Sequence, residues 1–345
     1  MYKKTTLRDV AKIAGVSTQT VSRVINDHPD VSDETRLKIQ DIINDLGYSP
    51  NIIARSLSRG KTNTLGIVGF RLDFFGSSSV LMAVERKARE LGFSMLLTLL
   101  NEIDDLDVDF ILENLVSRQV DGLIWTVPGK LDEANFIMQK TRELPIPVVI
   151  LNHNPDERHN FVCLDNCYGG KIATQHLLDE GYRQVGIITG PSGWWESEER
   201  AKGWREALGY ADPWSVPADL VEEGDWSSQS GEKAFNNLIE KNPQINAVFA
   251  CNDQMALGAY RAAQKRGMDI PSDIGLIGFD NIPEAAFFTP PLSSVNQNCW
   301  DLGAGAVTRL MELLKNPKAE KGSVIWVKPQ LVVRESSLRK DQSLA

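Results

Sequence analysis

The 345-residue sequence predicts a small all-α part at the N-terminus and a larger α/β part that contains two doubly wound parallel sheets. Three observations predict this fold class. Residues 6–47 carry apolar side chains at helical spacing. From residue 65 onward, apolar strand-like runs alternate with amphipathic helical runs. The two parts also differ in net charge, which indicates separate domains.

Two short helices are expected before residue 27. The first starts after Thr6, which forms a capping-box pattern with Asp9, and it stops at Gly15. The second starts after Ser17 and turns its apolar residues inward, because they recur at helical spacing. Its polar positions then point outward, and they are Thr18, Gln19, Ser22 and Arg23.

A third helix is expected from Ser32 to a C-cap at Gly47, which completes a headpiece of residues 1–48. The predicted linker comprises residues 49–61. Pro50 stands where a proline favours the start of a helix, and residues 51–59 are compatible with a helix that Gly60 ends. We expect a linker helix that is too short to be stable alone.

The remaining chain, residues 62–340, predicts two α/β subdomains. Strands buried in parallel sheets are continuously apolar, which assigns strands to residues 65–70, 93–99, 120–126, 147–151, 184–189, 246–251 and 274–279. The chain is expected to change subdomain near residues 161–166 and to return near 290–296. The expected N-subdomain is then residues 62–162 and 292–325, and the expected C-subdomain is residues 163–291 and 326–340.

The net charge of −9 is unevenly distributed along the chain. Residues 1–61 hold ten Lys or Arg against seven Asp or Glu, a net charge of +3. The rest of the chain holds 27 basic and 39 acidic residues, a net charge of −12, and it also holds all eight tryptophans. A small basic segment on an acidic body is compatible with nucleic-acid binding by the N-terminal part, in spite of the acidic total.

Composition also argues against a membrane, a secreted protein or a metal centre. The sequence shows no apolar run that is long enough for a signal peptide or a membrane span, which favours the cytoplasm. Its cysteines are Cys163, Cys167, Cys251 and Cys299. They lack a second pair at zinc-site spacing, so they are expected to be reduced thiols, and neither a metal nor a cofactor is expected.

The outward positions of the second helix have the chemistry to read DNA. In a helix-turn-helix, the second helix presents its first residues to base edges in the major groove. Gln19 can form two hydrogen bonds with adenine, and Arg23 can reach guanine or a phosphate. Each residue taken alone is as typical of the solvated surface of a small helical bundle.

Residues 6–26 read TLRDVAKIAGVSTQTVSRVIN. This stretch closely resembles the headpiece of the lac repressor/galactose repressor (LacI/GalR) family. The resemblance continues in VSDETR at 31–36, GYSPN at 47–51, ARSL at 54–57, GYRQVGIITG at 181–190, CNDQMALG at 251–258, IGFDN at 277–281 and PPLSS at 290–294. It implies a helix-turn-helix headpiece on a periplasmic-binding-protein-like domain, in a sequence-specific DNA-binding transcriptional regulator that we expect to be a repressor.

The same resemblance implies a homodimer on double-stranded, pseudo-palindromic operator DNA. The positions that match the DNA contacts of the family are Thr6, Ser17, Thr18, Gln19, Thr20, Ser22, Arg23, Asn26, Asn51, Ala54 and Leu57. In the family, the linker helix enters the minor groove and inserts a leucine between central base pairs, and the matching residue is Leu57. We expect residues 50–59 to become helical on DNA. The alternative is a flexible linker.

Polar residues follow several of the predicted strands, where open α/β sheets bind their ligands. A sugar needs fixed hydrogen-bonding groups and a flat aromatic surface, and the resemblance assigns both kinds of contact here. The expected effector site consists of Asp73, Asn152, Arg200, Trp226, Asn252 and Asp280. The expected effector is a small molecule, with a mono- or disaccharide favoured, and the stacking residue is Trp226.

Some residues near this site have a structural alternative. Asp253 is expected to be the N-cap of the helix that follows it, and Trp204 is expected to be a core residue. Trp194 and Trp195 either form a wall of the cleft or pack at an interface, and the sequence leaves this open.

Two other classes of function compete with a regulator. A sugar receptor for transport has the same fold, but residues 1–60 argue against it. An enzyme finds little support, because the histidines lack metal-ligand spacing and no nucleophile elbow, P-loop or dinucleotide motif is present, although His153 near the cleft could act as a base. The sequence leaves open whether the effector releases the regulator from DNA or recruits it.

Overall fold

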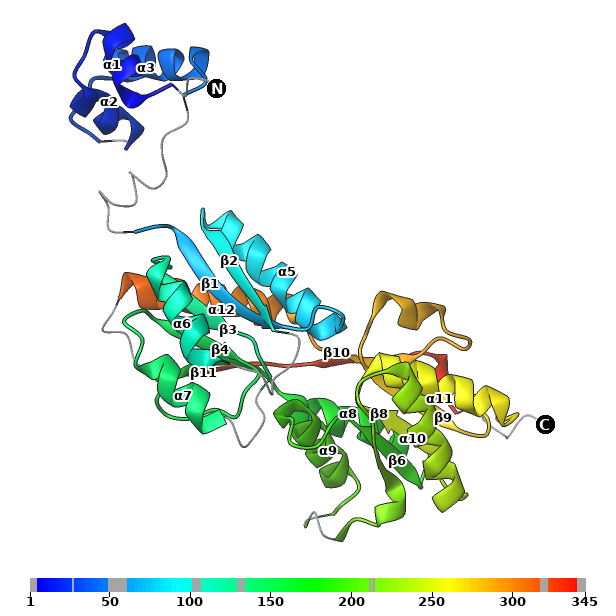
Figure 1. Ribbon diagram of the computed structural model, residues 1–345. Coiled ribbons are helices and arrows are strands. Elements are labelled where there is room, and N and C mark those ends of the chain that lie inside the picture. Colours follow the sequence, from blue (N-terminus) through cyan, green and yellow to red (C-terminus); the bar gives the residue numbers. More distant parts are fainter. Residues whose placement is uncertain are drawn as a thin grey trace. The chain divides into compact units, whose positions relative to one another are not determined.

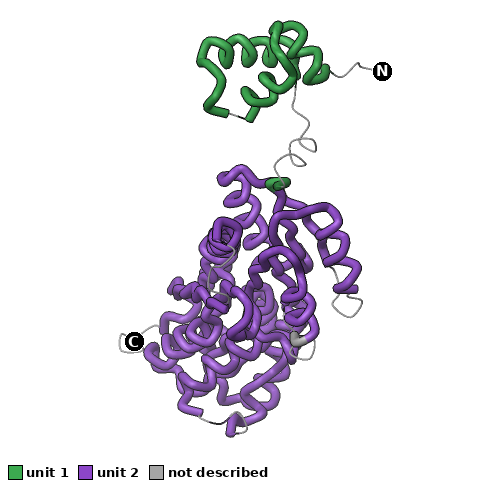
Figure 2. The backbone as a smooth tube through the Cα atoms, turned by 90° about the vertical axis from the view of Figure 1, so that its left-hand side faces the viewer, with its two compact units in different colours: residues 1–63 green, residues 64–345 purple. Residues whose placement is uncertain are grey.

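The computed structural model describes residues 5–26, 28–48, 61–100, 107–128, 134–210, 212, 215–316 and 322–339. The chain forms two compact units, residues 1–63 and residues 64–345 (Figure 2). Within the described residues, no helix combines the length and the apolar character that a membrane crossing requires.

Unit 1 is a small helical bundle of α1 (Leu7–Ala14), α2 (Thr18–Ile25) and α3 (Asp33–Asp45). Its core is formed by the apolar residues Val10, Ala11, Ala14, Val21, Val24, Val31, Ile39 and Ile43. The predicted caps of α1 are present, because Thr6 and Asp9 form a capping box and Gly15 ends the helix with a φ of 70°. The C-cap of α3 is Leu46, one residue before the predicted Gly47, which follows with a φ of 57°. A positive φ at this position costs a residue with a Cβ atom more than it costs glycine.

Unit 2 contains two six-stranded sheets (Figure 1). The first has the strand order β11-β5-β4-β3-β1-β2, all parallel. Its strands are β1 (Thr64–Phe70), β2 (Ser94–Leu100), β3 (Gly122–Trp125), β4 (Val148–Leu151), β5 (Asn160–Leu164) and β11 (Val324–Val327). We call this part the N-subdomain, with the helices α5 (Phe75–Glu90), α6 (Val108–Ser117), α7 (Ala134–Arg142) and α12 (Cys299–Lys315).

The second sheet has the strand order β12-β10-β9-β8-β6-β7, and only β12 is antiparallel to its neighbour. Its strands are β6 (Val185–Thr189), β7 (Val221–Glu223), β8 (Ala247–Ala250), β9 (Gly275–Asp280), β10 (Ser293–Asn296) and β12 (Gln330–Val332). This C-subdomain has the helices α8 (Asn166–Asp179), α9 (Trp195–Ala207), α10 (Ser228–Lys241) and α11 (Asp253–Lys265), and the 3-10 turns Ala218–Leu220, Pro283–Phe287 and Glu335–Ser337.

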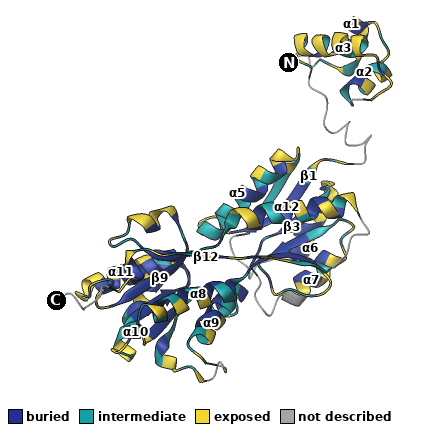
Figure 3. Ribbon diagram, turned by 180° about the vertical axis from the view of Figure 1, so that it is seen from behind, coloured by how far each residue is buried: buried dark blue, intermediate teal, exposed yellow. Residues whose placement is uncertain are grey.

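Helices cover both faces of the N-subdomain sheet, which is why its strands are apolar throughout. Alternate residues of one strand belong to different core clusters: Leu65 and Ile67 pack with α5 and α12, whereas Val68 and Phe70 pack with α6 and α7. Figure 3 shows the result, with buried strands between helices whose outer faces are exposed. The doubly wound α/β fold predicted from the alternating pattern is confirmed.

The chain crosses between the subdomains three times, after β5, after β10 and after β11. The positions differ by a few residues from the expected boundaries. Residues 293–296 were expected in the N-subdomain, but they form β10 and pair with β9 of the C-subdomain. The reason is local: the turn at Pro290 and Pro291 leads into one more strand of the same sheet and does not end it. The first crossing likewise follows Leu164, the last residue of β5.

Candidate functional site

In unit 1, α2 presents polar side chains to solvent. Thr18, Gln19 and Arg23 are exposed, whereas Val21 on the inner face is fully buried. Ser17 accepts a hydrogen bond from the backbone N–H of Thr20 at 3.1 Å, so its hydroxyl caps the helix. The bundle therefore fixes Gln19 and Arg23 one turn apart on a solvent-facing side of α2.

Other predicted DNA contacts also have structural partners. Thr6 Oγ1 donates to the carboxylate of Asp9 at 2.6 Å, and Asn26 Nδ2 donates to Ser22 Oγ at 3.4 Å. Thr20 is half-buried, and its hydroxyl lies 2.9 Å from that of Ser17. Three further predicted contacts lie outside the described residues, namely Asn51, Ala54 and Leu57.

In unit 2, a cavity of about 100 Å³ lies between the two subdomains. Its N-subdomain walls are Phe74, Phe75, Gly76, Ser77, Val80, Thr126, Pro128, Leu151 and Asn152. The opposite walls are Trp194, Glu196, Arg200, Trp226, Asn252, Gln254, Asp280 and Gln297. As expected for an open α/β sheet, Asn152 and Asn252 follow the carboxyl ends of β4 and β8, and Asp280 ends β9.

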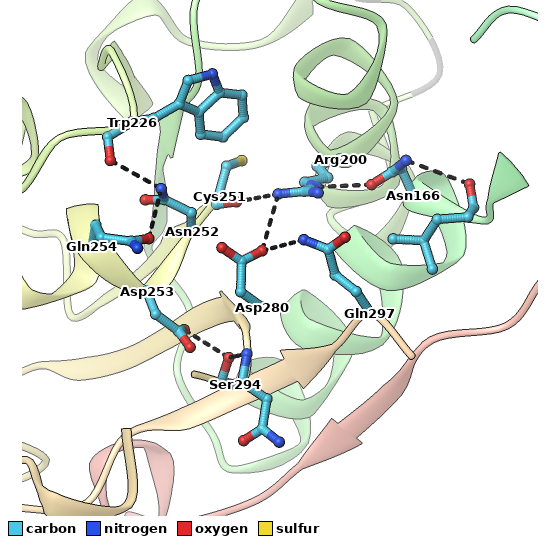
Figure 4. A network of polar contacts seen from close by, with 12 residues as sticks. Asn166, Arg200, Trp226, Cys251, Asn252, Asp253, Gln254, Asp280, Ser294 and Gln297 are labelled. Atoms are coloured by element: carbon cyan, nitrogen blue, oxygen red, sulfur yellow. Dashed lines mark hydrogen bonds and ion pairs between the residues drawn. The ribbon is translucent and has the colours of Figure 1, made fainter. Parts of the chain in front are cut away.

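Arg200 is the centre of the polar network beside this cavity (Figure 4). Its Nε donates to Asn166 Oδ1 at 2.8 Å, and its Nη1 donates to the carbonyl oxygen of Cys251 at 2.5 Å. The same Nη1 lies 3.9 Å from Asp280 Oδ1, and both side chains are buried. The guanidinium carbon lies 3.7 Å from the ring centroid of Phe279. These contacts fix the guanidinium in one orientation and leave Nη2 without a hydrogen-bond partner among the described residues.

Asp280 supplies the buried acceptor of this network. Gln297 Nε2 donates to Asp280 Oδ1, and the backbone of Asp280 has a φ of 112°. Burial raises the pKa of Asp280 to about 6, although Arg200 and Gln297 both favour the ionised form. The carboxylate is therefore mainly ionised at neutral pH and can accept a hydrogen bond from a ligand.

The residue that caps α11 differs from the expectation. Asn252 is the N-cap, because its Oδ1 accepts a hydrogen bond from the backbone N–H of Met255 at 2.8 Å. Asp253 is fully buried and accepts from the Ile282 backbone N–H at 2.8 Å and from Ser294 Oγ at 2.7 Å. The expectation for Asp253 was wrong, because the residue before it already satisfies the helix end. Asp253 instead ties α11 to the segments after β9 and in β10.

Trp226 forms an aromatic wall of the cavity. Its carbonyl oxygen accepts a hydrogen bond from Asn252 Nδ2 at 2.9 Å, and its φ is 73°. The indole covers Gly190, where a Cβ atom would come within 2.1 Å of the ring. Trp194 continues this wall, with its ring centroid 6.0 Å from that of Trp226. Asn252 and Gly190 therefore set the position of the indole.

The two tryptophans whose role the sequence left open have different roles. Trp194 lines the cavity and also contacts Phe70 of β1, with ring centroids 5.7 Å apart. Trp195 is buried in the core cluster of the N-subdomain, although it begins α9 of the C-subdomain. Its ring centroid lies 6.4 Å from that of Trp326 in β11. Both residues therefore make contacts across the gap between the subdomains. Trp204 is a core residue, as expected.

Of the two remaining predicted effector residues, Asn152 lines the cavity and Asp73 does not. Asn152 lines the cavity, with a φ of 46°, and its Oδ1 accepts from the Leu164 backbone N–H at 2.9 Å. Asp73 does not line it, which corrects the expected effector site. Its side chain is 58% exposed and pairs with Arg71 at 2.6 Å. Arg71 and Asp73 are two residues apart in the turn after β1, and their side chains form an exposed ion pair.

Several cavity residues were missed from the sequence, among them Glu196, Gln297, Thr126, Gln254, Phe74 and Phe75. Thr126 follows β3 directly, so the rule that assigned Asn152 also applied to it. Gln297 follows β10, a strand that the apolar pattern did not predict. Glu196 precedes the predicted site residue Arg200 by four residues on α9, so helical spacing from Arg200 is the signal that could have found it.

Neither His153 nor a metal centre adds chemistry to this cavity. His153 is buried, and neither of its ring nitrogens has a hydrogen-bond partner among the residues that the structure describes. Burial lowers its pKa to about 4, so the ring is neutral at pH 7. It is absent from the cavity walls. No group of His, Cys, Asp and Glu side chains within the described ranges could hold a metal ion.

Comparison with known proteins places both units in one family. Residues 6–51 match the model of the bacterial regulatory proteins, lacI family, and residues 174–337 match a periplasmic binding protein-like domain. The HTH-type transcriptional repressor PurR of Pasteurella multocida is 34% identical over 333 residues, which cover 96% of this chain and 98% of the relative. The PurR repressor of Aliivibrio salmonicida is 33% identical over 335 residues, with the same coverage of each chain.

Solved structures agree with this assignment. The lac repressor dimer bound to operator and the anti-inducer ONPF has a TM-score of 0.86 and 29% identity, covering 97% of this chain and 100% of that one. A complex of the transcriptional regulator CelR with cellobiose has a TM-score of 0.71 and 30% identity, covering 96% and 100%. The chain therefore belongs to the lacI family of DNA-binding bacterial regulatory proteins.

Proposed function

We propose that this chain is a sequence-specific transcriptional repressor that binds a pseudo-palindromic operator as a homodimer, and that a sugar bound between its subdomains controls its affinity for the operator. Unit 1 reads DNA through α2, and unit 2 senses the effector. Two similar proteins support this assignment, because the lac repressor dimer has been solved bound to operator and the regulator CelR has been solved with cellobiose.

The observation that carries the effector half is the combination of polar and aromatic groups at one cavity. Arg200 and Asp280 offer a buried donor and a buried acceptor, and Trp226 offers a flat apolar face. A sugar ring has hydroxyl groups on its rim and C–H groups on its faces, so it matches such a set.

The DNA half rests on the exposed side chains of α2 and on the linker. We propose that Gln19 and Arg23 contact base edges, with Thr18 beside them, and that Ser17, Thr20 and Thr6 position the helix on the phosphates. The linker residues Asn51, Ala54 and Leu57 complete the interface from the minor groove in this proposal. The proposal assigns residues 1–48 to the DNA-binding headpiece, residues 49–61 to the linker and residues 62–340 to the effector-binding domain.

Selection of binding sites from random DNA tests the operator half. We expect an enriched, approximately two-fold symmetric motif. Replacing Gln19 or Arg23 by Ala removes a base contact, so preference should relax at particular base pairs by about 1–3 kcal/mol each. The matched control is Gln40→Ala, an exposed glutamine on α3, which should leave the motif unchanged. A selection without an enriched motif contradicts the proposal.

A melting-temperature screen with mono- and disaccharides tests the effector half. A ligand present at 100 times its dissociation constant stabilises the folded protein by about 2.7 kcal/mol, because it binds only that state. The active sugar should also change the affinity for the selected operator, and the sign of this change distinguishes an inducer from a corepressor. Chemical turnover of that sugar by the purified protein would instead support an enzyme.

A further inference from the structure

Glu196 is a cavity residue with a buried carboxyl oxygen that lacks a partner. It is the second residue of α9, and it lines the cavity between the subdomains. Its Oε2 exposes less than 1 Å² and has no hydrogen-bond partner among the described residues. Buried carboxyl oxygens are normally hydrogen-bonded, because an unpartnered one loses its hydration without compensation. In a binding cavity, such an oxygen is available to a ligand.

The charges around the cavity are not balanced within the protein. The ionisable side chains that line it are Glu196, Arg200 and Asp280. Arg200 uses its Nε and Nη1 for Asn166, the Cys251 carbonyl and Asp280. Within the part of the chain that is described, Glu196 makes no ion pair. When Glu196 is ionised, the cavity therefore carries one negative charge in excess.

A second residue of the cavity wall, Trp226, also has a polar group without a hydrogen-bond partner among the described residues. The indole Nε1 of Trp226 is also buried and also lacks a partner among the described residues. Trp226 and Glu196 both line the cavity, as does Arg200, whose Nη2 also lacks a partner among the described residues. A ligand that carries both donors and acceptors, such as a sugar or an amino sugar, matches this set of residues.

We propose that Glu196 is a specificity-determining contact of the effector, whose carboxylate accepts a hydrogen bond from a hydroxyl or amino group of a neutral or cationic sugar and disfavours phosphorylated sugars. This inference rests on the sugar-responsive function proposed above. A phosphate group in this cavity meets two carboxylates and only one guanidinium, and that guanidinium is already paired. Like charges at close range in a buried site reject a ligand strongly.

The proposal makes effector binding depend on pH. Burial raises the pKa of Glu196 to about 7, against the opposing influence of Arg200. A ligand donor bonds best to the ionised form, so affinity is full above pH 7 and falls as the pH drops through this value. Burial also raises the pKa of Asp280, at the end of β9, to about 6. Cys163 on β5 also lies near Glu196, and burial raises its pKa to about 12, so it does not change charge between pH 6 and pH 8.

The experiment compares the wild type with E196Q and with a matched control, E199Q. Glu199 is on the same helix and pairs with Lys202 at 3.6 Å, and it does not line the cavity. Melting temperatures are measured with D-glucose, D-galactose, cellobiose, D-glucosamine, glucose 6-phosphate and adenine. Each probe that stabilises the wild type is then titrated by calorimetry at pH 6, 7 and 8.

We expect a neutral sugar or an amino sugar to stabilise the wild type, and glucose 6-phosphate to have no effect. E196Q should weaken the active probe about tenfold at pH 8, because a hydrogen bond to a carboxylate is stronger than one to an amide. The wild type should lose about tenfold in affinity from pH 8 to pH 6, and E196Q should keep only the smaller share that comes from Asp280. E199Q should match the wild type.

The outcomes that overturn the proposal differ from those that overturn the sugar-responsive function. A sugar that binds E196Q as well as the wild type, with the same pH profile, removes Glu196 from the site and leaves the function intact. Tighter binding of the phosphorylated sugar than of glucose also overturns the charge selection. If adenine alone stabilises the wild type and E196Q weakens it, the sugar assignment fails while the Glu196 contact stands. Failure of every donor-bearing probe overturns both.

Discussion

At the residue scale, Asp280 tests whether the Arg200 network binds the effector. Asp280→Ala leaves the buried guanidinium without its carboxylate, and we expect it to cost about 2–4 kcal/mol of effector binding free energy. Trp226→Ala should reduce the effector binding free energy less, because it removes a stacking surface and leaves no buried charge without a partner. Operator binding should survive in both variants, since α2 belongs to the other unit. Calorimetric titration with the active sugar and an operator-binding assay measure the two properties.

Asp73→Ala is the matched control, because that carboxylate is exposed and lies outside the cavity walls. It should respond to effector like the wild type. The more conservative Asp280→Asn separates loss of charge from misfolding, because it keeps a side chain that can bond to Gln297. Normal effector affinity in Asp280→Ala contradicts the assignment of this network.

Residues at strand ends were predictable where the backbone alone fixes their place. Asn152, Asn252 and Asp280 are at the cavity because they stand at the carboxyl ends of β4, β8 and β9. Asp73 also follows the carboxyl end of a strand, but its side chain is exposed and pairs with Arg71. Glu196 follows no strand, so the strand-end rule missed it, although it lies one helical turn before Arg200 on the same face of α9.

At the element scale, α8 and α9 approach so closely that glycine is required between them. A Cβ atom at Gly203 would lie 1.9 Å from the carbonyl oxygen of Cys167, and one at Gly170 would lie 2.1 Å from that of Arg200. This approach brings Asn166 of α8 within 2.8 Å of Arg200 on α9. The two glycines therefore help to place the guanidinium at the cavity.

Gly203→Ala is expected to push the two helices apart, because the clash is with backbone and cannot be relieved by a rotamer change. Folding stability should fall by about 1–3 kcal/mol, and effector affinity should fall with it. Chemical denaturation and calorimetric titration measure the two losses. The control is Gly305→Ala in α12, where a new Cβ would meet Val162 at an ordinary 3.4 Å. Equal stability of the two variants would refute the close-approach argument.

The apolar strands of the two sheets were predictable, and the short strands near the crossings were not. β10 contains Ser293 and Ser294, which are fully buried but polar. Hydrogen bonds with Ser336, Ser337 and Asp253 satisfy them, and these partners lie more than 40 residues away in the sequence. A hydrophobic pattern cannot identify a strand that is buried through polar pairing, so the crossing was expected a few residues too early.

At the scale of the whole molecule, unit 2 consists of two sheets joined by three crossings, with the cavity between them. An effector can change operator affinity only if it binds two conformations of this unit differently. Side chains that bridge the subdomains set the balance between such conformations. Trp194 and Trp195 are bridging residues of this kind: Trp194 contacts Phe70 of β1, and Trp195 packs in the N-subdomain core beside Trp326.

Trp195→Ala is therefore predicted to weaken effector binding without altering a single cavity wall, because Trp195 does not line the cavity. The contact of Trp195 with the N-subdomain stabilises the arrangement in which the walls come together, and its loss lowers the population of that arrangement. Apparent affinity falls in proportion to this population, so a shift of about 1.4 kcal/mol weakens binding about tenfold.

Calorimetric titration measures the affinity, and small-angle X-ray scattering with and without effector measures the compactness of the protein. Trp204→Phe, a core change within the C-subdomain, should lower stability and leave affinity unchanged. If Trp195→Ala binds effector as tightly as the wild type, closure does not depend on this bridge, and the cavity walls must already be held together by the crossings alone.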